Sequence, residues 1–220
     1  MPDAKRVKTG IKGLDKLMEG GLLEGSVYLL SGNAGAGKTI FSMQFLKEGV
    51  ANKESVLYIS TEEKEDSIRK GFKILGWDLG KSIEIIGLSP DELEDEWESL
   101  LSNKIERNKI KRIVLDSISL STLYYKDDYS VRKYLYKFVS FLKDKKITCL
   151  LTSEVPEKQG VLSRGGIEEF VCDGVILLQF LGTGGKYERG LTIRKMRWTS
   201  HTLDIHPYRI EKNKGIVLGG

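Results

Sequence analysis

The amino-acid sequence predicts an α/β fold: a mostly parallel sheet flanked by helices, with an antiparallel extension toward the carboxyl terminus. Through about three quarters of the chain, short apolar runs alternate with helical stretches, as in a parallel sheet covered on both faces. In the final quarter, strand-like runs follow one another without helices between them, which favours antiparallel pairing. We find no internal repeat or linker in the 220 residues, so we expect a single domain over residues 1–220.

The first half of the chain alternates strands and helices around a glycine-rich loop. Residues 9–15 lead into a short amphipathic segment that ends near Gly20. A helix is predicted over residues 65–75, because apolar residues recur there at i, i+4 and i+7. The other elements expected here are strands at 26–31, 55–60 and 83–86 and a helix from 39 toward 52.

The second half begins with a helix whose start combines a capping serine, an early proline and acidic residues: Ser89, Pro90, Asp91 and Glu92. Trp97 lies on the apolar stripe of this helix, so we assign it to the core rather than to a stacking surface. The remaining elements expected are a strand at 112–116, a helix at 129–145, and strands at 147–152, 175–181, 191–196 and from 207 to 210.

Composition limits the class of partner. The chain has 35 Lys and Arg against 31 Asp and Glu, and this mild excess of +4 permits an acidic partner without requiring one.

Cys149 and Cys172 lie far apart in apolar runs, which predicts buried thiols rather than a disulfide. His201 and His206 lack metal-site spacing. No apolar run is long enough to cross a bilayer, and residues 1–6 lack a signal-peptide core, so we expect a cytoplasmic protein without a membrane partner.

Residues 32–39, with the sequence GNAGAGKT, match the phosphate-binding pattern G-x-x-x-x-G-K-[ST] at every required position. Glycines let the loop turn its N–H groups toward an anion, and the helix that follows adds its positive dipole. We expect Lys38 to reach the β- and γ-phosphates and the Thr39 hydroxyl to hold Mg²⁺. The predicted contacts to ATP are Gly32, Asn33, Ala34, Gly35, Ala36, Gly37, Lys38, Thr39 and Ile40.

Polar residues end three other predicted strands at the same edge of the sheet. Asp116 follows four apolar residues, a pattern typical of the carboxylate that orders the Mg²⁺ shell. Of Glu62 and Glu63, one is expected to polarise the attacking water and the other to open the next helix as a favourable charge. Ser153 stands where a short polar group senses the γ-phosphate or where a strand simply turns into a loop.

The order of these motifs resembles the RecA/KaiC superfamily of ring and filament ATPases, which share a P-loop NTPase core. Closer similarity to KaiC lies in TGIKGLDKLMEGGL at residues 9–22, GGIEEFVCDGVILL at 165–178 and KMRWTSH at 195–201. Together these stretches span the chain from about Thr9 to Gly219, the extent of one KaiC-type domain. The resemblance implies a Mg²⁺-dependent ATPase that assembles with itself, with a hexameric ring favoured.

In the KaiC family the last of these motifs reaches into the nucleotide of the neighbouring subunit. The resemblance therefore implies that Lys195 and Arg197 act in catalysis in trans and that His201 approaches the same nucleotide less deeply. Period two puts Lys195 and Arg197 on one face of their strand; the alternative is a solvated basic strand. Trp198 departs from the family, which has a small residue at this position.

Three functions from different classes follow. The first is a self-assembling ATPase with a regulatory conformational cycle; autokinase activity is a variant of it. We find no match to the segment phosphorylated in the second KaiC domain, so the sequence does not support a clock role. The second is a RadA-paralogue-like factor that binds single-stranded DNA through the loops at 119–128 and 155–166, where acidic residues interleave with Tyr124, Tyr125, Lys126, Lys158 and Arg164. The third is a scaffold that binds ATP and barely hydrolyses it.

Overall fold

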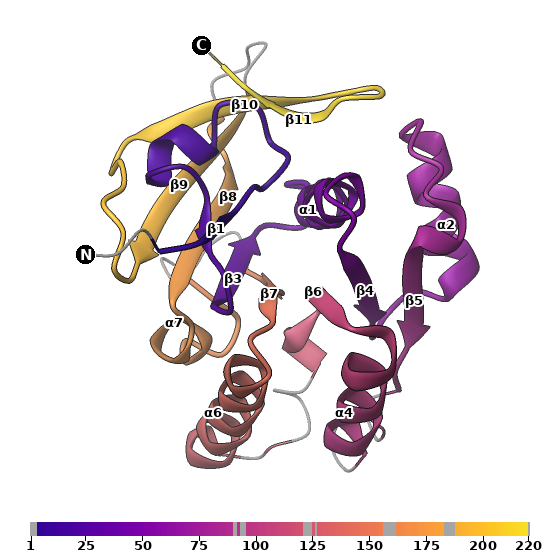
Figure 1. The fold of residues 1–220 in the computed structure, drawn as a ribbon. Helices are drawn as coiled ribbons and strands as arrows, with labels where there is room; N and C mark the ends of the chain where they lie inside the picture. The colour runs from indigo at the N-terminus through magenta and orange to yellow at the C-terminus, as the bar shows by residue number, and fades with distance from the viewer. Residues whose placement is uncertain are drawn as a thin grey trace.

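The computed structural model describes residues 4–89, 92, 96–120, 125, 127–155, 162–182 and 188–219. Within these residues a nine-stranded sheet has the order β11-β10-β9-β8-β3-β7-β6-β4-β5, and β1 and β2 form a small separate sheet. The strands from β8 to β5 run parallel to their neighbours, whereas β9, β10 and β11 are antiparallel. Figure 1 shows α1 and α2 on one side of the sheet and α4 and α6 on the other. The predicted fold class is confirmed.

The parallel part alternates strands with helices, as the apolar periodicity predicts. Its strands are β3 (Val27–Gly32), β4 (Ser55–Ser60), β5 (Ile83–Gly87), β6 (Ile110–Asp116), β7 (Thr148–Glu154) and β8 (Gly174–Phe180). Its helices are α1 (Lys38–Ala51), α2 (Glu65–Ile74), α4 (Trp97–Asn108), α6 (Asp128–Asp144) and the short α7 (Glu168–Val171). The helix α4 is described only from Trp97. Upstream of it, Ser89 and Glu92 cap each other through the Ser89 N–H and the Glu92 N–H, as predicted.

The antiparallel part consists of β9 (Arg189–Met196), β10 (Ile205–Glu211) and β11 (Gly215–Leu218). The strand β11 was not predicted, nor were β1 (Arg6–Val7) and β2 (Leu22–Leu23), because such short strands carry too few residues to show a period. Single turns of 3₁₀ helix lie at Asp15–Met18, Gly80–Ser82 and Ile118–Leu120. Several residues of our predictions lie outside the described residues: Pro90, Asp91, Tyr124, Lys126 and Lys158.

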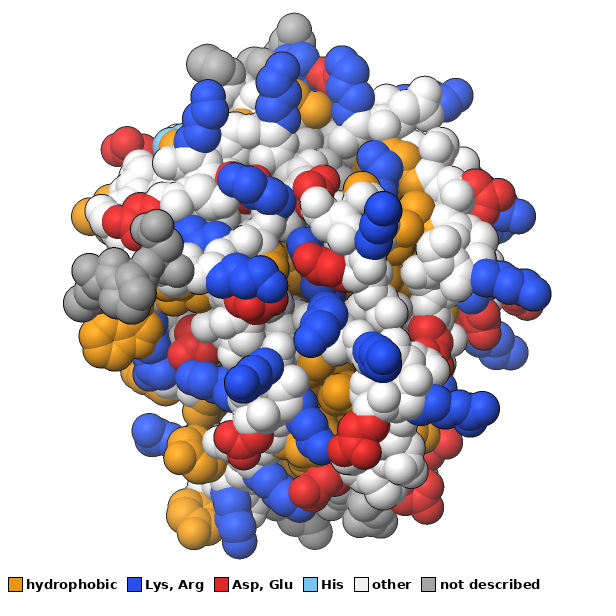
Figure 2. Space-filling model, viewed as in Figure 1, with side chains coloured by type: hydrophobic (Ala, Val, Ile, Leu, Met, Phe, Trp, Pro, Cys, Tyr) orange, Lys and Arg blue, Asp and Glu red, His pale blue; other side chains and the backbone are white. Residues whose placement is uncertain are grey.

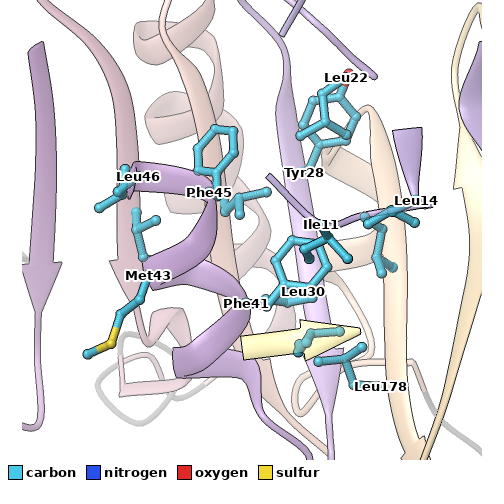
Figure 3. Packing of buried hydrophobic residues seen from close by; sticks show 14 of the residues in the cluster. Ile11, Leu14, Leu22, Tyr28, Leu30, Phe41, Met43, Phe45, Leu46 and Leu178 are labelled. Carbon is cyan, nitrogen blue, oxygen red and sulfur yellow. The ribbon is translucent and has the colours of Figure 1, made fainter. Parts of the chain in front are cut away.

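The helix α1 packs its apolar side chains against the centre of the sheet. In Figure 3, Phe41 and Phe45 of α1 lie beside Leu30 of β3 and the amino-terminal Ile11, all of them buried. On the opposite face Trp97 is 3 % exposed and meets Phe138 of α6 edge-on at 4.8 Å between ring centroids. The assignment of Trp97 to the core is therefore confirmed. The helices on the two faces thus bury the sheet between two apolar clusters.

Candidate nucleotide-binding site

A cavity of about 420 Å³ opens at the carboxyl edge of the parallel strands, the end at which open α/β sheets bind ligands. Register explains why residues far apart in sequence meet there. The end of β3 pairs with the end of β7, and Ser60 at the end of β4 is paired with Asp116 at the end of β6. The described lining residues are Ala34, Gly35, Gly37, Lys38, Thr39, Ile40, Ser60, Glu62, Glu63, Asp116, Ser117, Glu154, Arg189 and Ile210.

The phosphate loop needs its glycines for two separate reasons. Gly35 and Gly37 have φ of +75° and +104°, backbone conformations that residues other than glycine rarely adopt. Gly32 instead faces the backbone of β8: a Cβ there would stand 2.3 Å from the carbonyl oxygen of Leu178. Gly37 also caps α1, so the free N–H groups of the first helical turn point into the cavity region.

Lys38 is buried at the floor of the cavity. Its Nζ donates to the carbonyl oxygens of Gly32, at 2.9 Å, and Asn33, at 3.1 Å. Burial lowers the pKa of Lys38, while the nearby carboxylates of Glu154, Asp116 and Glu62 act in the opposite direction. The loop thus holds one cation by its own backbone, at the place where a phosphate would compete for it.

Asp116 sits at the centre of a set of hydroxyl donors. Its Oδ2 accepts hydrogen bonds from Thr39 Oγ1, at 3.0 Å, and from the Tyr58 hydroxyl, and its Oδ1 accepts one from Thr152 Oγ1. Burial, followed by the charge of Asp116, raises the pKa of Tyr58 well above its ordinary value, so the phenol remains a donor. A threonine hydroxyl beside a fixed carboxylate is the hard oxygen donor set that Mg²⁺ takes together with water and phosphate oxygens. The residues present therefore fit this ion.

The two adjacent glutamates have different partners. Glu62 Oε1 accepts a hydrogen bond from the Ser117 hydroxyl at 2.9 Å, which ties it to the residue after Asp116. Glu63 accepts one from the Ser67 hydroxyl in the first turn of α2, and its own N–H donates to Ser60 Oγ at 2.8 Å. The Glu63 carboxylate is therefore engaged with the amino-terminal end of a helix, whereas Glu62 is held against the strand end that carries Asp116.

Ser153 does not line the cavity. Strand alternation turns its neighbour Glu154 to the cavity, and Ser153 is fully buried on the other face of β7. There its Oγ accepts a hydrogen bond from the Arg164 N–H at 3.2 Å and lies 3.3 Å from Glu168 Oε1. Ser153 is absent from the described lining because it and its neighbour Glu154 point to opposite faces of β7, and its contact with the γ-phosphate stays a prediction.

Five of the described lining residues were not among the predicted site residues: Ser60, Ser117, Glu154, Arg189 and Ile210. The first three lie at or close to predicted strand ends, whereas Arg189 and Ile210 come from the antiparallel part. Arg189 and Ile210 line the cavity, and the ring of Phe180 lies 5.2 Å from the Arg189 guanidinium carbon. Phe180 also approaches the phosphate loop, 3.8 Å from where a Cβ on Gly35 would be. Within the described part of the chain, Arg189 Nε is buried without a hydrogen-bond partner. No local pattern marks these residues, because only the pairing of β8, β9 and β10 returns them to the loop.

The predicted trans residues lie at the opposite, amino edge of the sheet. Lys195 lies next to the last residue of β9, Met196, and Arg197 directly follows the strand. β9 runs antiparallel to β8, and Met196 pairs with Gly174 at the start of β8. The length of β3, six residues at about 3.3 Å each, puts on the order of 20 Å between this edge and the phosphate loop of the same chain. Lys195 Nζ donates to the carbonyl oxygens of Glu169 and Cys172, both at 2.7 Å, so the two basic residues share the neighbourhood of α7.

His201 follows in the loop after β9. Its Nδ1 lies 2.9 Å from the Thr202 carbonyl oxygen, and the side chain is half-buried. Like Lys195 and Arg197, it does not line the cavity of its own chain. Cys149 and Cys172 are both buried, as expected, and burial raises the pKa of each thiol.

The family model described as ATPase: KaiC matches residues 7–220. The chain belongs to the KaiC family of ATPases. A UPF0273 protein of Thermotoga maritima is 32% identical, over 97% of this chain and 96% of its own length. The circadian clock protein KaiC3 of Synechocystis is 33% identical over 97% of this chain but only 45% of its own length, so the chain spans less than half of the clock proteins it matches.

A solved structure agrees with the fold. The crystal structure of a KaiC-like protein from the hyperthermophilic archaeon Pyrococcus horikoshii OT3 superposes with a TM-score of 0.87 at 35% identity, covering 99% of this chain and 100% of that one. In the described part of the chain, no helix has the length and apolar character needed to span a membrane. The chain is thus a KaiC-like P-loop ATPase in family and fold.

Proposed function

We propose that this protein is a Mg²⁺-dependent ATPase whose active sites are completed between copies of the chain in a ring or filament, with a hexameric ring favoured, and that hydrolysis drives a regulatory conformational cycle. One observation carries the proposal. The carboxyl edge holds a phosphate loop, a Mg²⁺ donor pair and a candidate base, while Lys195 and Arg197 lie at the other edge, too far away to reach them. The chain forms one compact domain over residues 1–220 in this proposal.

The chain's own residues divide the hydrolytic work. Glu62 accepts the proton of a water that attacks the γ-phosphorus, and the bond from that phosphorus to the bridging oxygen of ADP breaks, releasing ADP and inorganic phosphate. Lys38 exchanges its loop carbonyls for phosphate oxygens, and Thr39 and Asp116 hold Mg²⁺, which would neutralise phosphate charge when bound. Arg197 of the adjoining copy stabilises the charge that develops in the transition state.

The other end of the nucleotide has a fitting wall. Phe180, Ile210 and the aliphatic part of Arg189 give apolar and cationic surface beside the loop, suited to a purine base or its ribose. His201 of the adjoining copy approaches the same nucleotide in this arrangement. The single unpaired nitrogen of Arg189 supports a polar contact with the ligand.

A mixing experiment tests the division between edges. Arg197→Ala subunits keep an intact phosphate loop, and Lys38→Ala subunits keep intact Lys195 and Arg197. Each variant alone should be nearly inactive, because every interface lacks one half of the site. Mixed assemblies contain some complete interfaces, so part of the ATPase activity should return. If activity stays absent although labelled subunits exchange, Arg197 has no trans role and the proposal fails.

A factor that binds single-stranded DNA is the second candidate. Of the loop residues invoked for it, Tyr125 is half-buried, and its ring centroid lies 5.3 Å from that of Tyr134. A ring packed in this way is not fully available to stack on a nucleic-acid base. On the face shown in Figure 2, Lys and Arg side chains are interleaved with Asp and Glu rather than forming one basic stripe. Stimulation of the ATPase by single-stranded DNA would select this candidate. Tight ATP binding with negligible turnover would select the scaffold.

A further inference from the structure

Trp198 combines two unfavourable features. It has φ of +58°, in the left-handed region that bulky side chains rarely adopt, and it is 86 % exposed. The other two tryptophans, Trp77 and Trp97, are each 3 % exposed. A strained backbone and a fully solvated indole gain nothing for the single chain, which points to a role for this side chain outside it.

The backbone around Trp198 is held from both sides. The Arg197 N–H donates to the Asp173 carbonyl oxygen at 2.8 Å, and Thr199 Oγ1 accepts a hydrogen bond from Arg6 Nη1 at 3.2 Å. The tryptophan between these two fixed residues is therefore presented outward by the fold rather than by a free loop.

Trp198 belongs to an apolar and basic surface at the amino edge. Phe170 of α7 is 60 % exposed, and its carbonyl oxygen accepts a hydrogen bond from Arg197 Nη2 at 3.4 Å. Arg194 of β9 and Arg197 after it are also exposed. Figure 2 shows hydrophobic side chains standing out from the surface over the side of the molecule where β9, α7 and α6 lie.

The opposite edge of the sheet has the complementary charge. Among the described residues that line the nucleotide cavity, the carboxylates Glu62, Glu63, Asp116 and Glu154 outnumber the cations Lys38 and Arg189. A basic surface at one edge and an acidic cavity at the other cannot meet within one chain, but they meet when copies stack head to tail. Such a heterologous contact closes into a ring or continues as a filament.

We propose that Trp198 is the aromatic anchor of this contact: it seats on the carboxyl-edge face of a second copy of the chain, beside that copy's nucleotide cavity. The proposal rests on the inter-subunit site described above and adds the residue that binds the copies together. Arg197 supplies charge to the nucleotide, and Trp198 supplies the buried area that keeps Arg197 there. Tryptophan is the residue type most often found at the energetic centre of such contacts.

Native fluorescence tests the proposal on the full-length chain. Because Trp77 and Trp97 are buried, acrylamide quenching of the single copy reports mainly on Trp198. Raising the protein concentration with ATP and Mg²⁺ should make Trp198 inaccessible to acrylamide in step with the increase in mass measured by light scattering. Assemblies in which the exposed tryptophan remains as quenchable as in the single copy would overturn the anchor.

Variants separate anchoring from folding. Trp198→Gly relieves the left-handed backbone, so its melting temperature as a single copy should be unchanged or higher, and ATP binding by the single copy should be unchanged. The protein concentration needed for its assembly should rise by about tenfold or more, the scale expected on truncating a central aromatic side chain. Tyr136→Ala removes an aromatic that is 68 % exposed on α6 and serves as the matched control, which should assemble like the parent.

The outcomes distinguish this inference from the proposed function. If the parent chain assembles with ATP and Trp198→Gly assembles at the same concentration, the anchor is wrong and the inter-subunit site stands. If the parent chain stays a single copy at every concentration with ATP and Mg²⁺, both are wrong. Loss of assembly in Tyr136→Ala and Trp198→Gly alike would also overturn the anchor, because any exposed aromatic would then have the same effect.

Discussion

The carboxyl edge of the central sheet holds Lys38 and Asp116 more firmly than the amino edge holds Arg197. At the carboxyl edge, Lys38 is bound to two backbone carbonyls and Asp116 receives three hydroxyl donors. At the amino edge, Arg197 is exposed, and its side chain reaches Asp173 and the Phe170 carbonyl only at 3.4 Å each. The first edge is arranged before any ligand arrives, whereas the second holds its guanidinium loosely.

This difference suggests how one fold can bind a ligand by itself and still depend on a second copy for part of its activity. Preorganised donors gain affinity because little ordering remains to be done on binding. A loosely held arginine gains nothing until a neighbouring phosphate orders it, so its contribution depends on assembly. We therefore expect loss of the preorganised cation Lys38 to change nucleotide binding and loss of the loosely held Arg197 to change turnover.

The largest effect should come from Lys38→Ala. Removing the cation leaves the β- and γ-phosphates without their charged partner, so binding of ATP at micromolar concentration should disappear. Arg197→Ala is the contrasting variant: it should bind ATP as the parent does and lose turnover by roughly 10³-fold, the scale that loss of an arginine finger would have. Calorimetric titration with ATP and steady-state phosphate release measure the two quantities. Equal loss of binding in both variants would erase the distinction between the edges.

An intermediate effect is expected within the carboxyl edge itself. Glu62→Gln should retain ATP binding and lower the turnover number by roughly 10²-fold, the scale of a positioned general base. Glu63→Gln is its matched control and should cost less than about tenfold, because Glu63 is engaged with Ser67 at the start of α2. Single-turnover hydrolysis separates the chemical step from product release. The reverse order of the two variants would assign the base to Glu63.

The smallest effect should follow Tyr58→Phe. This change keeps the buried ring and removes one of three hydroxyl donors to Asp116, and a single neutral hydrogen bond contributes about 1 kcal/mol. The Mg²⁺ concentration for half-maximal ATPase should shift by only a few-fold, since Thr39 and Thr152 still hold the carboxylate. A loss near that of Glu62→Gln would mean that the phenol takes part in the reaction, and the edge would then have no redundancy.

Much of the fold followed from local patterns. Strands such as Ser55–Ser60 were predicted at their true ends. A continuous run of apolar residues is typical of a strand whose two faces are both covered by helices, so the ends of the run mark the ends of the strand. The helix α6 begins at Asp128, one residue before the prediction, because the Asp127 carboxylate caps it by accepting the Ser130 N–H. Errors of this size are confined to the ends of elements, where a side-chain cap rather than periodicity decides.

The candidate site divides along the same line. Lys38, Thr39 and Asp116 were predicted together, because strand ends in a parallel sheet meet at one edge whatever the details of packing. Ser153 was predicted to approach the γ-phosphate but does not line the described cavity, since the face that a strand residue occupies depends on a register that the end of an apolar run does not reveal. Arg189 was missed for a related reason: it reaches the cavity only through the antiparallel return of β9.

The sequence by itself determined the phosphate loop, the alternation of strands and helices, and the carboxylates that follow them, because each is written in residues close together along the chain. The tertiary structure alone decided which of two adjacent glutamates stands beside Asp116, and that Lys195 and Arg197 lie on the order of 20 Å from their own phosphate loop. The tertiary structure also decided that Trp198 has a left-handed backbone conformation and a solvent-exposed side chain. These properties depend on strand pairing and direction, which join residues 55 or more positions apart and leave no local trace.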